Sequence, residues 1–281
     1  MKDKSQRHAV IVFFAIAFGV PWFGWTIRWL LDIDPATLLA RVLFYTGDFC
    51  SIGGLVAAYV ASEWSGLKDM WRRFTLWRVP AIWWLCALFL PAIWTFLAIA
   101  GLGISHGGFG AFDPGGLTRA LTPGILIAIT TGPLGEEFGW SGFLLPQFLK
   151  QFTPLTAALI IGVIRAIWHF PLYHNSIIGT IGGTLRFSAV VVCLSLVMTV
   201  IFLKTKTSIL IAIVIHWTIN VMPGLVQSLF PSLFSPESSV SFSGGWQLIA
   251  IALVTIFLIT KHRKLLTQKG DAPTRQAAGH L

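Results

Sequence analysis

Charged residues are scarce in this sequence, and their scarcity excludes a soluble globular fold. Only 11% of the 281 residues are charged, whereas 55% are hydrophobic and 14% are aromatic. Apolar side chains in this proportion exceed what one soluble core can bury. A membrane-spanning helix needs about 20 mostly apolar residues, and runs of this kind recur along the chain. The composition therefore predicts an all-α, polytopic membrane protein.

Cysteine is also scarce. The three cysteines, Cys50, Cys86 and Cys193, lie apart in apolar runs and form no CxxC pair. This excludes a disulfide framework and a cysteine-based zinc site. The net charge of +9 would suit nucleic acid if it gathered on one polar face, but the basic residues lie in short segments between apolar runs. We expect the lipid bilayer as a partner and no nucleic acid.

Eight apolar segments are candidates for spanning helices, and together they predict a single transmembrane domain over residues 1–267. The chain has no internal repeat, and its polar stretch at 268–281 is predicted to be a disordered tail. The first run is expected to be retained as a span, because no small-residue cleavage site follows it. The expected spans are residues 9–30, 38–62, 81–103, 121–147, 153–173, 186–203, 207–229 and 245–260.

Basic residues are distributed unevenly between the connecting segments. If the N-terminus lies in the cytoplasm, most of the 20 lysines and arginines fall in cytoplasmic segments. The positive-inside rule then predicts eight spans in the cell membrane with both termini in the cytoplasm.

Two adjacent carboxylates, Glu136 and Glu137, interrupt the fourth apolar segment. Ionisable groups at membrane depth are costly and normally face a bundle interior or a wet cavity. On a regular helix the two side chains would point about 100° apart. We therefore interpret this pair as the centre of a functional site.

Two further spans carry polar pairs at helical spacing. Arg165 and His169 lie four residues apart in the fifth segment, as do His216 and Asn220 in the seventh. This spacing places each pair on one helix face. Three spans thus present polar faces that a bundle can gather around one intramembrane cavity.

A carboxylate, two imidazoles and an amide suit the activation of water. Glu136 would take the proton of a water molecule as general base, while His216 and Asn220 would stabilise an oxyanion. Alternatively, Glu136, His169 and His216 would bind a divalent metal such as zinc with one position open. The residue types fit both versions, so metal-free and metal-assisted activation stay open.

Three short strings resemble the motifs of a known family. Glu136-Glu137-Phe138-Gly139-Trp140, Ile167-Trp168-His169-Phe170-Pro171 and His216-Trp217-Thr218-Ile219-Asn220 are similar to EExxxR, FxxxH and HxxxN of the CPBP intramembrane proteases. That family includes type II CAAX prenyl endopeptidases and bacteriocin self-immunity (Abi) proteins. The resemblance runs over about residues 120–225, the motif-bearing core.

The resemblance implies an intramembrane endopeptidase. Glu136 would be the base that activates water, Glu137 would orient the site, and His169 would be a partner of Glu136 or a metal ligand. His216 and Asn220 would form the oxyanion or metal-binding pair. Family members cleave near the C-terminus of prenylated proteins or process peptides, so a peptide or a prenylated protein is the expected substrate.

Two positions depart from the family pattern. Ser141 stands where EExxxR has arginine, and Arg165 stands where FxxxH has an aromatic residue. We predict that Arg165 pairs with Glu137 across the helix interface, so that no buried charge is left uncompensated. The alternative is a degenerate member that acts as a membrane adaptor or bacteriocin-immunity protein. A proton-coupled transporter is a third class, since membrane Glu and His also relay protons, but the absence of a repeat disfavours it.

Overall fold

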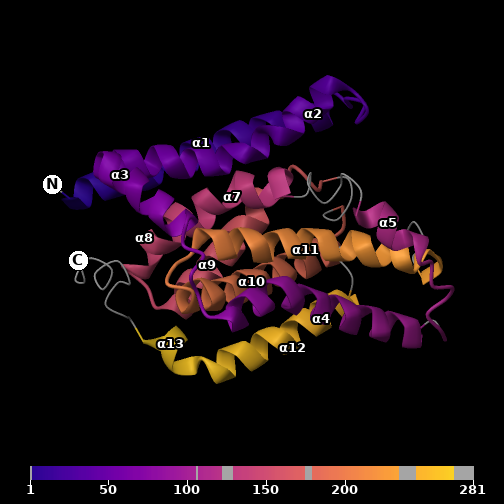
Figure 1. Ribbon diagram of the computed structural model, residues 1–281. Coiled ribbons are helices and arrows are strands. Elements are labelled where there is room, and N and C mark those ends of the chain that lie inside the picture. Colours follow the sequence, from indigo (N-terminus) through magenta and orange to yellow (C-terminus); the bar gives the residue numbers. More distant parts are fainter. Residues whose placement is uncertain (1, 106, 122–128, 175–178, 234–244, 269–281) are drawn as a thin grey trace.

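The computed structural model describes residues 2–105, 107–121, 129–174, 179–233 and 245–268, and within these it contains helices and no strands (Figure 1). This confirms the predicted all-α, polytopic membrane protein. Helices that are long and apolar enough to cross a membrane are Lys4–Leu30, Leu38–Phe74, Ala81–Ser105, Ile181–Lys204 and Ile209–Leu229. Shorter apolar helices occupy two more expected positions, Pro154–Trp168 and Gly245–Lys261. The total of eight spans stays a prediction.

The N-terminal part of the chain forms one side of the bundle. Helix α1 (Lys2–Leu30) packs along α3 (Phe49–Phe74), which follows the short α2 (Leu38–Phe44) and the 3-10 turn η1 (Tyr45–Asp48) (Figure 1). The second span was expected to be one helix over 38–62; it is instead interrupted by η1, and α3 continues past a break at Ser62 and Glu63. Glu63 has a φ of 51°, so the helix changes direction there.

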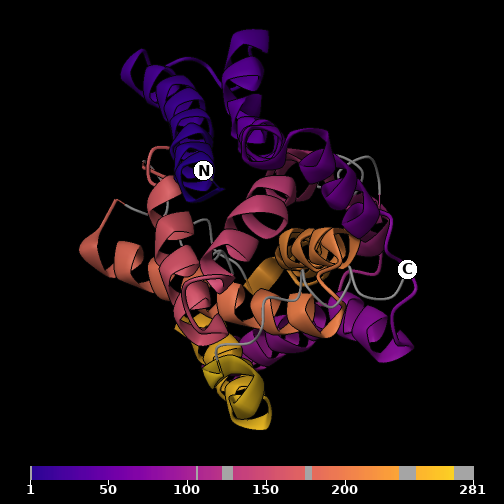
Figure 2. The same cartoon turned by 90° about the vertical axis from the view of Figure 1, so that its left-hand side faces the viewer.

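A second group of regular helices forms the opposite side. It consists of α4 (Ala81–Ser105), α10 (Ile181–Lys204), α11 (Ile209–Leu229) and α12 (Gly245–Lys261), which share one apolar core. In Figure 2 the α1–α3 pair and α12 lie on opposite sides of the molecule, with α11 between them. The remaining short elements are α5 (Gly115–Leu121), η4 (Pro231–Leu233) and α13 (Arg263–Thr267).

The expected fourth span departs most from a regular helix. Its described part consists of the π-helix η2 (Thr130–Leu134), one α-helical turn α7 (Gly135–Glu137), the π-helix η3 (Phe138–Leu144) and α8 (Leu145–Leu149). Pro133 lies inside η2 and has no N–H to donate to a regular helical ladder. The described part of the expected span 121–147 is therefore helical but not a regular α-helix, and residues 122–128 lie outside the described residues.

The expected fifth span is shorter than predicted. Helix α9 (Pro154–Trp168) begins at Thr153, whose hydroxyl accepts a hydrogen bond from the Thr156 N–H at 3.3 Å. It ends at Trp168 and not at 173, because Pro171 cannot continue the helix. Its 15 residues rise about 22 Å, less than a hydrocarbon core of about 30 Å.

Close backbone packing fixes the irregular segment against α3. A Cβ at Gly54 would lie within 3.0 Å of the backbone of Phe138 and Gly139, and a Cβ at Gly139 would meet Cys50 in the same way. Only glycine permits this approach. Helix α1 is tied to α9 by the Trp168 indole, which donates to the Ala17 carbonyl at 2.6 Å. The irregular segment is therefore held in the centre of the molecule.

The start of α1 and α13 lie toward the same end of the bundle (Figure 1). Two ends of the chain on the same side agree with an even number of membrane crossings. The side that faces the cytoplasm stays a prediction from charge, as does the single domain over 1–267. Apart from Gln268, the predicted tail at 268–281 lies outside the described residues.

Candidate active site

The two carboxylates of α7 lie in the interior of the bundle. Glu136 is 6% exposed and Glu137 is fully buried. Charged groups at such depth require paired, hydrogen-bonded surroundings. Their partners come from η3, α9 and α11.

Glu137 is held on every side by polar partners. Its Oε1 accepts from His216 Nδ1 at 2.7 Å and from Arg165 Nη2 at 3.1 Å, and its Oε2 accepts from the Ser141 hydroxyl. Both oxygens are thus used within the protein. Glu137 is placed to orient other groups, and it does not line the cavity described below.

Glu136 is held on one side only. Its Oε2 accepts from the Trp140 indole at 3.0 Å and from Arg165 Nη2 at 3.5 Å. The Arg165 guanidinium also lies 5.8 Å from the centre of the Trp140 ring, within cation–π range. Because both contacts involve Oε2, Oε1 is left to face the cavity.

The predicted pairing of Arg165 with Glu137 is present in the structure. Arg165 reaches across from α9 to both carboxylates, at 3.1 and 3.5 Å. Ser141 stands at the motif position and bonds Glu137 as a neutral donor. The positive charge has therefore moved from the fourth segment to the fifth while still contacting the same pair.

His169 lies at the C-terminal cap of α9, one residue beyond the last helical residue, Trp168, although it was expected within the helix. Its Nδ1 lies 2.7 Å from the Arg165 carbonyl oxygen, which can only accept, so Nδ1 carries the proton and Nε2 is left for water or substrate. The ring stacks on Tyr173 at 5.6 Å with a 14° interplanar angle. Phe187 packs edge-on against both rings.

His216 and Asn220 come from the regular helix α11. Glu137 can only accept from His216, so Nδ1 of the imidazole carries a proton. The Nε2 atom donates a hydrogen bond only when the ring is doubly protonated. In that form the two carboxylates are balanced by two cations, Arg165 and His216. Asn220 is half-buried and adds an amide one helical turn further on.

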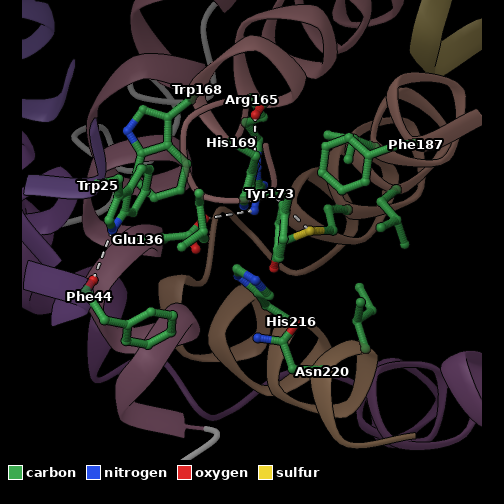
Figure 3. Close-up of a pocket in the computed structure, with 15 residues that line it drawn as sticks. Trp25, Phe44, Glu136, Arg165, Trp168, His169, Tyr173, Phe187, His216 and Asn220 are labelled. Atoms are coloured by element: carbon green, nitrogen blue, oxygen red, sulfur yellow. Dashed lines mark hydrogen bonds and ion pairs between the residues drawn. The ribbon is translucent and has the colours of Figure 1, made fainter. Parts of the chain in front are cut away.

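These side chains converge on one cavity of about 250 Å³. In Figure 3, His216 and Asn220 rise from α11 toward Glu136 and His169, and Tyr173 directs its hydroxyl end toward His216. Five of the predicted residues line it, whereas Glu137 and Ser141 lie behind its wall. The remaining wall is mostly apolar: Trp25, Phe44, Trp168, Leu172, Phe187, Val191, Leu194, Met198 and Ile219.

Within the described residues, the group close enough to share a metal ion consists of Glu136, Glu137 and His216. This set contains Glu137 where the metal-assisted version expected His169. The Arg165 guanidinium contacts both of its carboxylates, and His216 Nδ1 already bonds one of them. A divalent cation would have to share this space with an arginine, which is electrostatically unfavourable.

Sequence reasoning missed Trp140 and Tyr173 as parts of the site. Trp140 lies four residues after Glu136, and Tyr173 lies four residues after His169. Helical spacing could therefore have indicated Trp140, whose indole bonds Glu136. Tyr173 lies beyond the end of α9, in a turn where helical spacing does not apply. Sequence reasoning also missed the π-helical turns, which are frequent at functional sites.

The fold and site define a multi-pass, all-helical membrane protein with paired carboxylates, imidazoles and an amide around an interior cavity. Residues 118–222 match the family described as Rce1-like, type II CAAX prenyl endopeptidase. A relative named CAAX prenyl protease 2, from Methanococcus maripaludis, is 24% identical over 137 residues, which cover 46% of this chain and 48% of the relative. The chain thus matches about half the length of that protein. The matches confirm the resemblance to the CPBP family over the motif-bearing part of the chain.

Proposed function

We propose that the protein is an intramembrane endopeptidase of the CAAX prenyl protease type, with Glu136 activating water for peptide-bond hydrolysis. The observation that carries this proposal is that the two adjacent carboxylates, Glu136 and Glu137, differ in their surroundings. One is fully paired inside the protein, and the other presents an oxygen to a cavity that also holds two imidazoles and an amide. This arrangement supports general-base chemistry with separate donors for an oxyanion.

The reaction would run through one tetrahedral intermediate. Glu136 takes a proton from water, and the water oxygen bonds to the scissile carbonyl carbon. The carbonyl oxygen becomes an oxyanion stabilised by the Asn220 amide and the His216 imidazolium. When the C–N bond breaks, Glu136 returns its proton to the leaving amine. His169 Nε2 would hold the water in line for attack.

Arg165 and Glu137 would act by positioning. Arg165 pairs with both carboxylates and so compensates their negative charge inside the bundle. Glu137 fixes the imidazole of His216 through Nδ1, as the buried carboxylates of other hydrolases fix their histidines.

Because the wall of the cavity is mostly apolar, it favours a substrate that carries an apolar group. A prenylated or otherwise hydrophobic peptide would enter from the bilayer and bury that group against the wall. We keep the cytoplasmic placement of both termini as part of this proposal, because the basic connecting segments favour it.

The contacts of Arg165 favour metal-free activation. In the metal-assisted alternative, a zinc ion held by Glu136 and His216, with His169 or Glu137, would supply Lewis-acid chemistry in the same cavity. A chelator distinguishes metal-free from metal-assisted activation, because only the metal-assisted version loses activity when the metal is removed.

A second candidate rests on Ser141. A chain without the motif arginine could bind peptides without cutting them and act as a membrane adaptor or bacteriocin-immunity protein. The substitution Glu136→Gln separates this candidate from the protease, because an adaptor does not need the carboxylate.

The test is cleavage of a prenylated C-terminal peptide and of a mixed peptide library by the purified, detergent-solubilised protein, with and without a chelator. We expect Glu136→Gln to lower the rate by about 10²–10⁴-fold, the usual contribution of a general base. Glu63→Gln makes the same chemical change at an exposed position and should leave the rate unchanged.

Equal cleavage by Glu136→Gln and wild type would overturn the proposed base. Activity lost with the chelator and regained with zinc would establish the metal-assisted version. No cleavage of any peptide would favour the adaptor.

A further inference from the structure

Three groups of the site converge over the α-carbon of Gly132, a residue that neither the motifs nor the mechanism above include. Gly132 is buried in η2, four residues before Glu136. A Cβ atom at this position would lie 2.8 Å from Asn220 Nδ2, 3.6 Å from Glu136 Oε1 and 3.7 Å from His216 Nε2. Figure 3 shows the last three side chains directed into the same space.

These distances place three polar groups around the space over the Gly132 α-carbon. The Cβ position itself lies one covalent bond from that carbon, so a substrate oxygen would bind further out, in van der Waals contact with the α-carbon. An oxygen beside the Asn220 amide can accept a normal hydrogen bond of about 2.8–3.0 Å. A methyl group at Gly132 would overlap with an oxygen bound there. It would also approach the Asn220 amide more closely than a Cβ atom packs against its neighbours.

We propose that Gly132 is a positioning residue whose missing side chain provides the space for the scissile carbonyl oxygen. This inference rests on the proposed function. The carbonyl oxygen binds over the Gly132 α-carbon, accepts from Asn220 and His216, and leaves Glu136 Oε1 beside the attacked carbon. The substrate must therefore approach the backbone of η2 directly, and the irregular turn around Pro133 serves to present that backbone.

Gly132→Ala tests the proposal, with Gly224→Ala as the matched control. Gly224 also lies in a helix, on α11 one turn after Asn220, and a Cβ there has nothing within 4 Å. We expect Gly132→Ala to lower kcat by at least about 100-fold, the loss typical of a blocked oxyanion donor. KM should change by less than about threefold, because remote contacts of the substrate persist. Gly224→Ala should behave as wild type.

Asn220→Ala supplies the second readout, because it removes the amide that the new methyl would meet. On this background, adding Gly132→Ala should lower kcat by less than about threefold, since coupled residues are not additive. Thermal denaturation should follow the same pattern. Gly132→Ala should lower Tm relative to Gly224→Ala in the otherwise native chain, and most of that loss should vanish when Asn220 is alanine.

Wild-type kcat for Gly132→Ala, in an enzyme whose cleavage requires Glu136, would overturn the inference and leave the proposed function standing. Fully multiplicative effects of Gly132→Ala and Asn220→Ala on kcat would also overturn it. If wild type cleaves nothing, the proposed function fails and the assignment of the carbonyl oxygen fails with it. The Tm comparison then still shows whether Gly132 faces the Asn220 amide.

Discussion

Two elements supply most of the site, and they are built in opposite ways. Helix α11 remains α-helical over all 21 residues, Pro223 included, and is capped at its N-terminus by Ser208, whose hydroxyl accepts from the Ile211 N–H at 3.2 Å. The segment Thr130–Leu149 changes between π- and α-helical turns three times and contains Pro133. Both elements carry site residues that line the cavity, but only α11 carries them on an uninterrupted α-helix.

The difference lies in what stabilises each element. Helix α11 packs apolar side chains, among them Ile211, Ile215 and Ile219, into the core that it shares with α4, α10 and α12. Residues Glu136–Ser141 also pack against α3, but their polar side chains are held in addition by hydrogen bonds and ion pairs that reach α9 and α11. We infer that Asn220→Ala in α11 should mainly change the rate, whereas Glu137→Gln in the irregular segment should also change stability.

The largest expected effect is that of Glu137→Gln on stability. Arg165 and His216 would lose the negative charge that they share, the amide NH2 would replace one acceptor oxygen, and breaking a buried ion pair typically costs about 3–5 kcal/mol. Thermal denaturation should show a large fall in Tm together with loss of cleavage. Glu136→Gln should leave Tm nearly unchanged, because one oxygen of Glu136 faces the cavity. Similar Tm losses in both variants would contradict the distinction between the two carboxylates.

The next effect is that of Asn220→Ala on rate. Loss of one oxyanion donor lowers kcat by about 10²–10³-fold, and Tm should change little because the amide is half-buried on a helix held by apolar packing. Steady-state cleavage and denaturation measure the two quantities. Gln227→Ala, an exposed amide on the same helix, is the control. A large Tm loss with an unchanged kcat would show that Asn220 is structural.

The smallest effect expected is that of Trp140→Phe. The substitution keeps an aromatic ring against Arg165 but removes the hydrogen bond to Glu136, and a bond to a charged group contributes about 1.5 kcal/mol or more. The cleavage rate should fall about tenfold if that bond orients the base. Trp64→Phe, which changes an exposed tryptophan, should have no effect. A wild-type rate for Trp140→Phe would show that the indole N–H does not contribute to catalysis.

The residues of α11 were accessible to sequence reasoning because their spacing is regular. His216 and Asn220 lie four apart on an unbroken helix, and they do face one cavity. The carboxylates were identified for a different reason, since two adjacent charges in an apolar run are rarely accidental. The partner of those carboxylates, Arg165, was predicted from the exchange of charge between two motif positions.

Other features of the site could not be read from the pattern of apolar residues. A π-turn shifts every following side chain relative to α-helical spacing, and nothing in residues 130–144 apart from Pro133 signals it. Spacing therefore could not show that Glu137 would be enclosed while Glu136 faced the cavity. The end of α9 at Trp168 was missed because the residues up to 173 remain largely apolar, although Pro171 marks the boundary.

The central claim is that Arg165 performs the task of the missing motif arginine. The most direct measurement compares cleavage and Tm for wild type, Arg165→Phe, and Arg165→Phe combined with Ser141→Arg, which restores the family pattern at both positions. We predict that the single variant loses at least about 10²-fold in rate along with several kcal/mol of stability. The double variant should recover at least about tenfold of that rate. A single variant that keeps the wild-type rate and Tm would contradict the account.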